Sequence, residues 1–243
     1  SPPKLPTQPR SQTRPRRSNG LVCEIDLLNI RSNKTRMNKT AIIIQKKLDE
    51  LIQKGSATVM LTGGRSAAQL YTEWKKLPNF KKIINTTFYF GDERCVPTDH
   101  PESNYGMIMQ TLLKDGLPNN CKIHRMQAEK QDVEKFAKAY EKLLPNSIDI
   151  MLLGIGEDGH IASLFPNSPQ LHEQKRLCLP IIGPKLPCKR LTVTPPVIKS
   201  AQTTYILALG REKQKIVEQV KQQPADINRL PVQMVENPIW CYN

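Results

Sequence analysis

Residues 57–76, ATVMLTGGRSAAQLYTEWKK, contain the pattern that decides the fold. A short β-rich run over 57–61 stops at a pair of glycines, and Ser66 can cap a helix that continues to about residue 76. A strand, a glycine turn and a helix, in that order, form the repeating unit of an α/β sheet. This stretch therefore predicts a protein built from alternating strands and helices.

The same alternation continues along the chain. Apolar or alternating runs predict further strands at residues 21–27, 86–90, 121–126, 148–153, 191–193 and 203–209. Helical periodicity predicts helices at about 35–54, 104–113, 131–144 and 211–222. This order favours a mostly parallel, doubly wound α/β sheet of the Rossmann-like kind, with helices on both faces. In such sheets ligands bind beyond the carboxyl ends of the strands.

The charge of the chain is unevenly placed. Its 243 residues carry a formal net charge of 36 − 22 = +14, and residues 1–40 hold 9 − 2 = +7 of it. Residues 1–20 contain five prolines and five basic side chains without an acid, so we expect a disordered basic tail, followed by a single domain over 21–243. The tail is interpreted as a solvated extension of a cytoplasmic protein. A transit peptide and a nonspecific contact with nucleic acid or anionic lipid are the alternatives.

Cysteine and histidine spacing gives no sign of a metal centre. The six cysteines and four histidines form no C-x-x-C, H-x-x-H or H-E-x-x-H motif. The pattern predicts free thiols, no metal and no cofactor. No apolar run approaches the ~18 to 20 residues that would span a bilayer, so no membrane contact is expected.

Four polar or glycine-rich segments follow predicted strands and are expected to meet in one cleft, namely 62–66, 91–94, 154–160 and 210–213. The first is a glycine turn entering a helix, which suits an anion because backbone N–H groups and the helix dipole point at one spot. A plain tight turn is an equal interpretation of it. In the second, Arg94 could hold a phosphate bidentately, whereas a solvated loop with Asp92 paired to Arg94 is the alternative.

The third segment, Gly154 to Gly159, matches G-x-G-x-x-G after a strand. We reject a dinucleotide site, because Glu157 and Asp158 would place two carboxylates beside a pyrophosphate. Asp158 stands two residues before His160 and can serve as the carboxylate partner of an imidazole general base. Caps of a loop and a helix are the equal alternative for these two residues.

Together these segments resemble the 6-phosphogluconolactonase family, from about residue 21 to about residue 240. The segment LGIGEDGHIASLFP at 153–166 is similar to the family's L-G-x-G-x-D-G-H-x-A-S-L-F-P loop. GDERCVP at 91–97 and HPESNYGM at 100–107 resemble its G-D-E-R-x-V-P and S-N-Y-x-M motifs. KRLTVTPPVIKSA at 189–201 and ILALGREKQ at 206–214 complete the order.

The resemblance implies hydrolysis of 6-phospho-D-glucono-1,5-lactone to 6-phosphogluconate in the oxidative pentose phosphate pathway, without a metal or a covalent nucleophile. It implies that His160 is the general base and that Asp158 fixes its tautomer. The phosphate is then expected at Gly64, Arg65, Ser66, Arg94, Arg190 and Lys213. The side chains expected to shape the pocket or bind sugar hydroxyls are Asp92, Glu93, Asn104 and Tyr105.

One departure affects the phosphate contacts, since many family members read G-G-S-T-P where this chain has Gly63-Gly64-Arg65-Ser66-Ala67. The related glucosamine-6-phosphate isomerases/deaminases carry a ring-opening glutamate five residues beyond the histidine. This chain has Phe165 there, which favours hydrolysis.

Three other functions stay open at this point. They are such an isomerase or deaminase, a non-catalytic sugar-phosphate-binding protein, and a nucleic-acid-binding module suggested by the charge. An aromatic content of 5% and the lack of a binding motif count against the last. The sequence predicts no oligomeric state.

Overall fold

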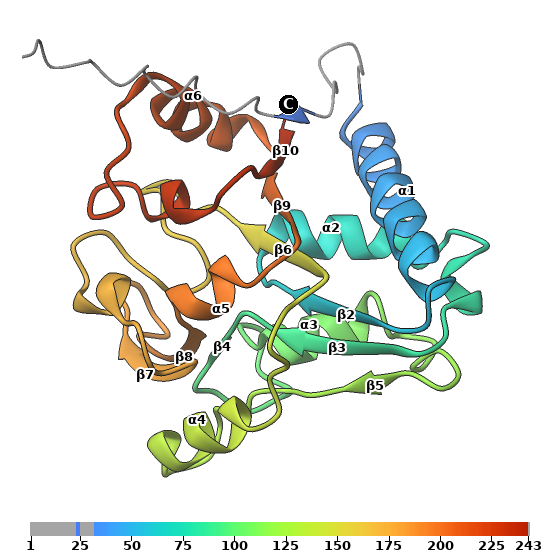
Figure 1. Cartoon of the computed structure of the whole chain (residues 1–243), viewed down its shortest axis with the longest axis horizontal. Coiled ribbons are helices and arrows are strands. Elements are labelled where there is room, and N and C mark those ends of the chain that lie inside the picture. The colour runs from blue at the N-terminus through green and yellow to red at the C-terminus, as the bar shows by residue number, and fades with distance from the viewer. Residues whose placement is uncertain (1–22, 25–31, 243) are drawn as a thin grey trace, which may run out of the picture.

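The computed structural model describes residues 23–24 and 32–242. Its main sheet has seven strands in the order β1-β10-β9-β6-β2-β3-β5, all parallel (Figure 1). The strands are β1 (Cys23–Glu24), β2 (Ala57–Leu61), β3 (Thr86–Phe90), β5 (Lys122–Ile123), β6 (Ile150–Gly154), β9 (Thr203–Ala208) and β10 (Ile239–Tyr242). The predicted parallel α/β sheet is therefore confirmed.

Six α-helices connect the strands in the described part of the chain. They are α1 (Asn33–Ile52), α2 (Arg65–Trp74), α3 (Asn104–Gln110), α4 (Val133–Glu141), α5 (Pro195–Lys199) and α6 (Gln214–Gln222). Short 3-10 turns occupy Phe80–Lys82, Pro169–His172, Arg211–Lys213 and Pro231–Met234.

The order of the strands fixes where these helices lie. From β2 the chain adds β3 and β5 on one side, and from β6 it adds β9 and β10 on the other. Because parallel crossovers are right-handed, α1, α2 and α3 cover one face, and α4, α5 and α6 cover the other. Figure 1 shows α1 and α2 beside each other, away from α5 and α6. The direction of winding changes between β2 and β6, which is where an open α/β sheet forms its ligand crevice.

A second, antiparallel sheet of three strands was not predicted. Its order is β4-β8-β7, with β4 at Asp92–Arg94, β7 at Cys178–Ile182 and β8 at Lys189–Val193. Strand β8 was expected, but residues 92–94 were expected to be a polar loop. A three-residue charged segment carries no β pattern of its own, and it becomes a strand here because β8 pairs with it.

The core joins distant parts of the sequence in one hydrophobic cluster that extends from Met37 to Cys241. Residues 150–153 of β6 are all buried, as expected for a central strand covered on both faces. The predicted tail at 1–20, and most of the first predicted strand at 21–27, lie outside the described residues.

Several element ends differ from the sequence prediction. Ser66 does not cap α2: Gly64 is the N-cap, and the Ser66 hydroxyl donates to the carbonyl of Leu209 at 2.8 Å. The helices expected to reach residues 113 and 144 end at Gln110 and Glu141. Within the described residues, no helix combines the length and apolar character needed to cross a membrane.

Candidate active site

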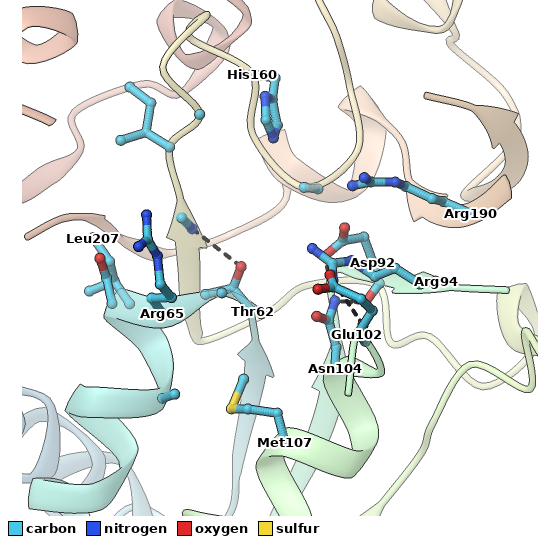
Figure 2. A pocket seen from close by; sticks show the side chains of 18 of the residues that line it. Thr62, Arg65, Asp92, Arg94, Glu102, Asn104, Met107, His160, Arg190 and Leu207 are labelled. Carbon is cyan, nitrogen blue, oxygen red and sulfur yellow. Dashed lines mark hydrogen bonds and ion pairs between the residues drawn. The ribbon is translucent and has the colours of Figure 1, made fainter. Parts of the chain in front are cut away.

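A cavity of about 490 Å³ opens at the carboxyl ends of the central strands. It is lined by residues that follow β2, β3, β6 and β9, so the four segments expected to meet do meet. Figure 2 shows His160 above the cavity, Arg65 on one side, and Arg94 with Asp92 on the other. Of the residues expected at the site, the lining includes Gly64, Arg65, Ser66, Asp92, Arg94, Asn104, His160, Arg190 and Lys213.

The loop after β6 holds a histidine–carboxylate pair. His160 Nδ1 lies 2.5 Å from Asp158 Oδ1, which also accepts the backbone N–H of His160 at 3.3 Å. Burial opposes ionisation of Asp158, but the hydrogen bond and charge of His160 outweigh burial and lower the Asp158 pKa to about 2. A carboxylate on Nδ1 favours the tautomer with its proton there, which leaves Nε2 as the nitrogen that can accept a proton.

Gly156 makes room for this pair. A Cβ at Gly156 would lie 2.0 Å from His160 Nδ1 and 2.5 Å from Asp158 Oδ1, closer than any real Cβ contact. The Gly156 N–H also donates to the His160 carbonyl at 2.9 Å, and Gly159 turns the loop with a φ of +82°. Of the glycines in the G-x-G-x-x-G match, Gly156 and Gly159 therefore bring Asp158 and His160 together.

At the glycine turn after β2, the backbone packs closely against the side chain of Asn104. A Cβ at Gly63 would lie 1.9 Å from Asn104 Oδ1, and Gly64 takes a φ of +94° to start α2. The first turn of α2 presents backbone N–H groups at this point. Arg65 Nη2 is 4.0 Å from Glu212 Oε1, and Lys213 follows in the same loop. This side of the cavity combines a helix start with two cations.

Two arginines from the small sheet line the other side. Arg94 and Arg190 stand directly opposite each other in the β4–β8 pair. Arg190 is buried, and its guanidinium donates from Nε to the Pro187 carbonyl at 3.0 Å and from Nη2 to the Lys185 carbonyl at 3.3 Å. Burial lowers the Arg190 pKa and the charge of Arg94 lowers it further, yet an arginine stays charged in proteins.

Arg94 has contacts of a different kind. Its Nη1 donates to the Glu102 carbonyl at 2.8 Å and to Glu102 Oε2 at 3.0 Å. Its buried Nε has no hydrogen-bond partner among the described residues. Such a donor, beside a second arginine, suits an anion.

Asp92, in β4, lies in a polar network with α3 and the loop after β6. It accepts Asn104 Nδ2 at Oδ1 (3.1 Å) and the Ser163 hydroxyl at Oδ2 (2.7 Å). Because Arg94 pairs with Glu102, the interpretation of residues 91–94 as a loop with Asp92 paired to Arg94 is wrong.

Glu93 and Tyr105 do not line the cavity. The carboxylate of Glu93 accepts the backbone N–H groups of Arg94, Asn104 and Tyr105 at 2.7 to 2.8 Å. Burial raises the Glu93 pKa, and these N–H bonds only partly oppose it. Glu93 therefore shapes the site by fixing the start of α3, where Asn104 lies. The Tyr105 ring packs 6.0 Å from that of Phe90.

Two buried tyrosines near the site were not predicted from the sequence. The Tyr71 hydroxyl accepts the Thr62 N–H at 3.0 Å and donates to the Thr62 carbonyl at 2.9 Å. Tyr140 binds Phe90 in the same way, at 2.8 and 2.9 Å. At the carboxyl end of β2 or β3, each hydroxyl makes the two backbone hydrogen bonds that a neighbouring strand would otherwise make. Neither gave a sequence signal, because a tyrosine on the inner face of a helix looks like any other core residue.

Thr62, Glu102 and Ser163 were also missed. The Thr62 hydroxyl accepts the Gly154 N–H at 3.2 Å, where β2 and β6 diverge, and so links the glycine turn to the His160 loop (Figure 2). Glu102 and Ser163 lie inside the quoted motifs, so the motifs themselves were a signal for them. Among the described residues, no group of three or more His, Cys, Asp and Glu side chains is placed to hold a metal ion.

Comparisons with known proteins show which family this chain resembles over most of its length. Residues 31–240 match the family described as glucosamine-6-phosphate isomerases/6-phosphogluconolactonase. A 6-phosphogluconolactonase of Streptomyces coelicolor is 36% identical over 196 residues, which are 73% of this chain and 75% of that protein. The 6-phosphogluconolactonase 3 of Saccharomyces cerevisiae is 34% identical over 220 residues, 82% and 87% of the two chains. The crystal structure of a 6-phosphogluconolactonase from Shewanella baltica has the same fold, with a TM-score of 0.77, 21% identity, and coverage of 90% of this chain and 96% of that one.

Proposed function

The chain belongs to the glucosamine-6-phosphate isomerase/6-phosphogluconolactonase family, and we propose that within it this protein is a lactonase. It hydrolyses 6-phospho-D-glucono-1,5-lactone to 6-phospho-D-gluconate, the second step of the oxidative pentose phosphate pathway. The observation that carries this assignment is the Asp158–His160 pair, with Nε2 as the available base, on a cavity that four cations line.

The reaction needs one activated water. A lactone is already an activated ester, so His160 Nε2 can take a proton from water as the oxygen attacks C1. The tetrahedral intermediate then collapses by breaking the bond from C1 to the ring oxygen, which receives the proton back from the imidazolium. Asp158 stays ionised and stabilises that imidazolium. A positioned general base supplies ~10²- to 10⁴-fold acceleration.

The cations select the substrate. The phosphate dianion is bound by the first turn of α2 at Gly64, Arg65 and Ser66, together with Lys213, Arg94 and Arg190. The Ser66 hydroxyl donates its proton to the carbonyl of Leu209. Toward the phosphate it can then act only as an acceptor, which requires a protonated phosphate. The backbone N–H of Ser66 is therefore the better donor. Asp92 and Asn104 face the sugar hydroxyls.

The ring of Phe165 separates this enzyme from an isomerase. It occupies the position five residues beyond His160 and packs 4.6 Å from the imidazole ring. An apolar ring cannot supply the carboxyl group that opens a sugar ring. A sensor without activity would have no use for an ionised partner on Nδ1, so the intact Asp158–His160 pair favours catalysis.

The test is hydrolysis of freshly made 6-phosphogluconolactone, followed by acid release at constant pH with EDTA present. We expect a rate well above spontaneous hydrolysis. In parallel, glucosamine 6-phosphate should give no fructose 6-phosphate or ammonia. A folded protein that leaves the lactone at its spontaneous rate, or releases ammonia, would overturn the assignment.

A further inference from the structure

Two glutamates at the rim of the cavity are each paired with an arginine that lines it. Glu102 Oε2 lies 3.0 Å from Arg94 Nη1, and Glu212 Oε1 lies 4.0 Å from Arg65 Nη2. Figure 2 shows Arg94 with Glu102 on one side of the cavity and Arg65 on the other. We call Glu102 and Glu212 the rim glutamates.

The rim glutamates account for most of the negative charge that faces the cations. Among the residues that the structure describes, four cations and three carboxylates line the cavity, 4 − 3 = +1, the cations being Arg65, Arg94, Arg190 and Lys213. The third carboxylate, Asp92, is buried and hydrogen-bonded to Asn104 and Ser163. The rim glutamates have side chains that are 52% and 45% exposed, so water can solvate them when they leave an arginine.

The main chain around Glu102 can hold Arg94 without the carboxylate. Arg94 Nη1 also donates to the backbone carbonyl of Glu102 at 2.8 Å. The Glu102 N–H in turn donates to His100 Nδ1 at 3.0 Å, which fixes that part of the backbone. The Glu102 side chain can therefore swing away while Arg94 keeps its place beside Arg190.

We propose that the rim glutamates are exchangeable counterions, which pair with Arg94 and Arg65 until the phosphate of the substrate displaces them. This proposal rests on the proposed function, since it names how the phosphate enters and leaves the site. The product 6-phosphogluconate carries a carboxylate as well as a phosphate, so it would be held tightly by four cations that only Asp92 opposed. By competing for two arginines, the rim glutamates weaken product binding and favour release.

Distance and burial rank the two pairs. The Arg94 side chain is 18% exposed and its ion pair is short, whereas the Arg65 side chain is 87% exposed and its pair is long. An exposed ion pair changes an equilibrium constant by no more than about five-fold, and a long, highly exposed pair changes it least. Glu102 should therefore have the larger effect of the two.

The test is the dissociation constant of 6-phosphogluconate and of inorganic phosphate, measured by titration calorimetry at fixed ionic strength. Glu102→Gln should tighten both ligands about two- to five-fold, and Glu212→Gln should tighten them less. The matched control is Glu73→Gln, which removes the same charge from an ion pair with Lys76 that does not line the cavity, and its effect should be below about 1.5-fold.

A double-mutant cycle distinguishes the Glu102–Arg94 ion pair from the general electrostatic effect of removing a negative charge. In an Arg94→Gln background the gain from Glu102→Gln should disappear, because the arginine for which Glu102 competes is gone. In the wild-type background, Glu102→Gln should also lower the KM for the lactone without raising kcat. Weaker ligand binding in Glu102→Gln, an equal gain in the Arg94→Gln background, or no binding of either ligand to the wild type would overturn the proposal.

Failure of the proposed function would look different. If the lactone is not hydrolysed but the binding cycle behaves as stated, the protein binds sugar phosphates without turning them over, and the counterion role stands. If the lactone is hydrolysed but the cycle shows no coupling, the lactonase stands and the counterion role is wrong.

Discussion

Replacement of Gly156 by Ala tests whether the catalytic pair depends on the space that this glycine leaves. The added Cβ would lie 2.0 Å from His160 Nδ1, whereas ordinary contacts begin at 3.4 Å, so the ring must move by about 3.4 − 2.0 = 1.4 Å. The backbone itself accepts alanine, because Gly156 is not among the residues with positive φ. The change is therefore a displacement of the imidazole and of Asp158, with no added strain in the main chain.

The size of the effect follows from that displacement. A shift of about 1 Å in a reacting group costs on the order of 10²-fold in rate. We therefore expect kcat for the lactone to fall about 100-fold or more in Gly156→Ala. The KM should change by no more than a few-fold, because the cations that hold the phosphate lie on other elements, namely α2, β4, β8 and the 3-10 turn at Arg211–Lys213.

The assay is acid release at constant pH, corrected for spontaneous hydrolysis, with circular dichroism to establish that the variant is folded. Gly154→Ala is the matched control in the same segment, since its Cβ would meet nothing closer than 3.7 Å and kcat should stay near the wild-type value. A folded Gly156→Ala enzyme whose kcat lies within about three-fold of wild type would refute the geometric argument.

Two further predictions concern stability. Asp158 has a folded pKa of about 2 against an ordinary 3.8, so it contributes stability that is present above about pH 3.8 and lost as the pH falls toward 2. The free energy of unfolding of Asp158→Asn should therefore fall less steeply than that of wild type across this window, as measured by urea unfolding at several pH values; parallel curves would contradict it. Tyr71→Phe should lower the free energy of unfolding by about 1–3 kcal/mol, because it leaves the N–H and carbonyl of Thr62 unsatisfied. Tyr140→Phe, which removes the same two bonds at Phe90, should cost about as much, and urea midpoints unchanged in both variants would show that the hydroxyls are dispensable.

The parallel sheet could be predicted well from the sequence because two independent features identify each central strand. Each is a run of apolar residues, and each ends in glycine or polar residues at the edge where loops gather. Strand β6 is the clearest case, with four buried residues followed by Gly154 and Gly156. Covering helices make such strands uniformly apolar, so local pattern and tertiary environment agree.

The antiparallel sheet was less predictable because its strands depend on partners far away in the sequence. Residues 92–94 are charged, and only pairing with 190–192 makes them a strand. Helix α2 shows the same limit at a smaller scale. The hydroxyl of Ser66 was expected to cap the helix, but Gly64 is the N-cap, and the Ser66 hydroxyl instead donates to the carbonyl of Leu209, which β9 brings close.

The site residues likewise divide into those that the sequence predicts and those whose roles depend on the fold. Motif spacing places Asp158 near His160 because only two peptide units separate them, and it finds Arg94, Asn104 and Arg190 through the resemblance. It cannot show that Glu93 turns toward the start of α3 instead of the cavity, because that choice depends on backbone N–H groups that fold into reach. The same holds for Tyr71, whose role appears only when α2 lies against β2.

The central claim is that His160 activates the water that opens the lactone. The most direct measurement is the progress curve of freshly made 6-phosphogluconolactone with His160→Ala, at an enzyme concentration that completes the wild-type reaction within seconds. We predict that the variant stays folded, still binds 6-phosphogluconate, and loses ~10²- to 10⁴-fold of the acceleration over spontaneous hydrolysis. A folded His160→Ala protein that hydrolyses the lactone at nearly the wild-type rate would contradict the account.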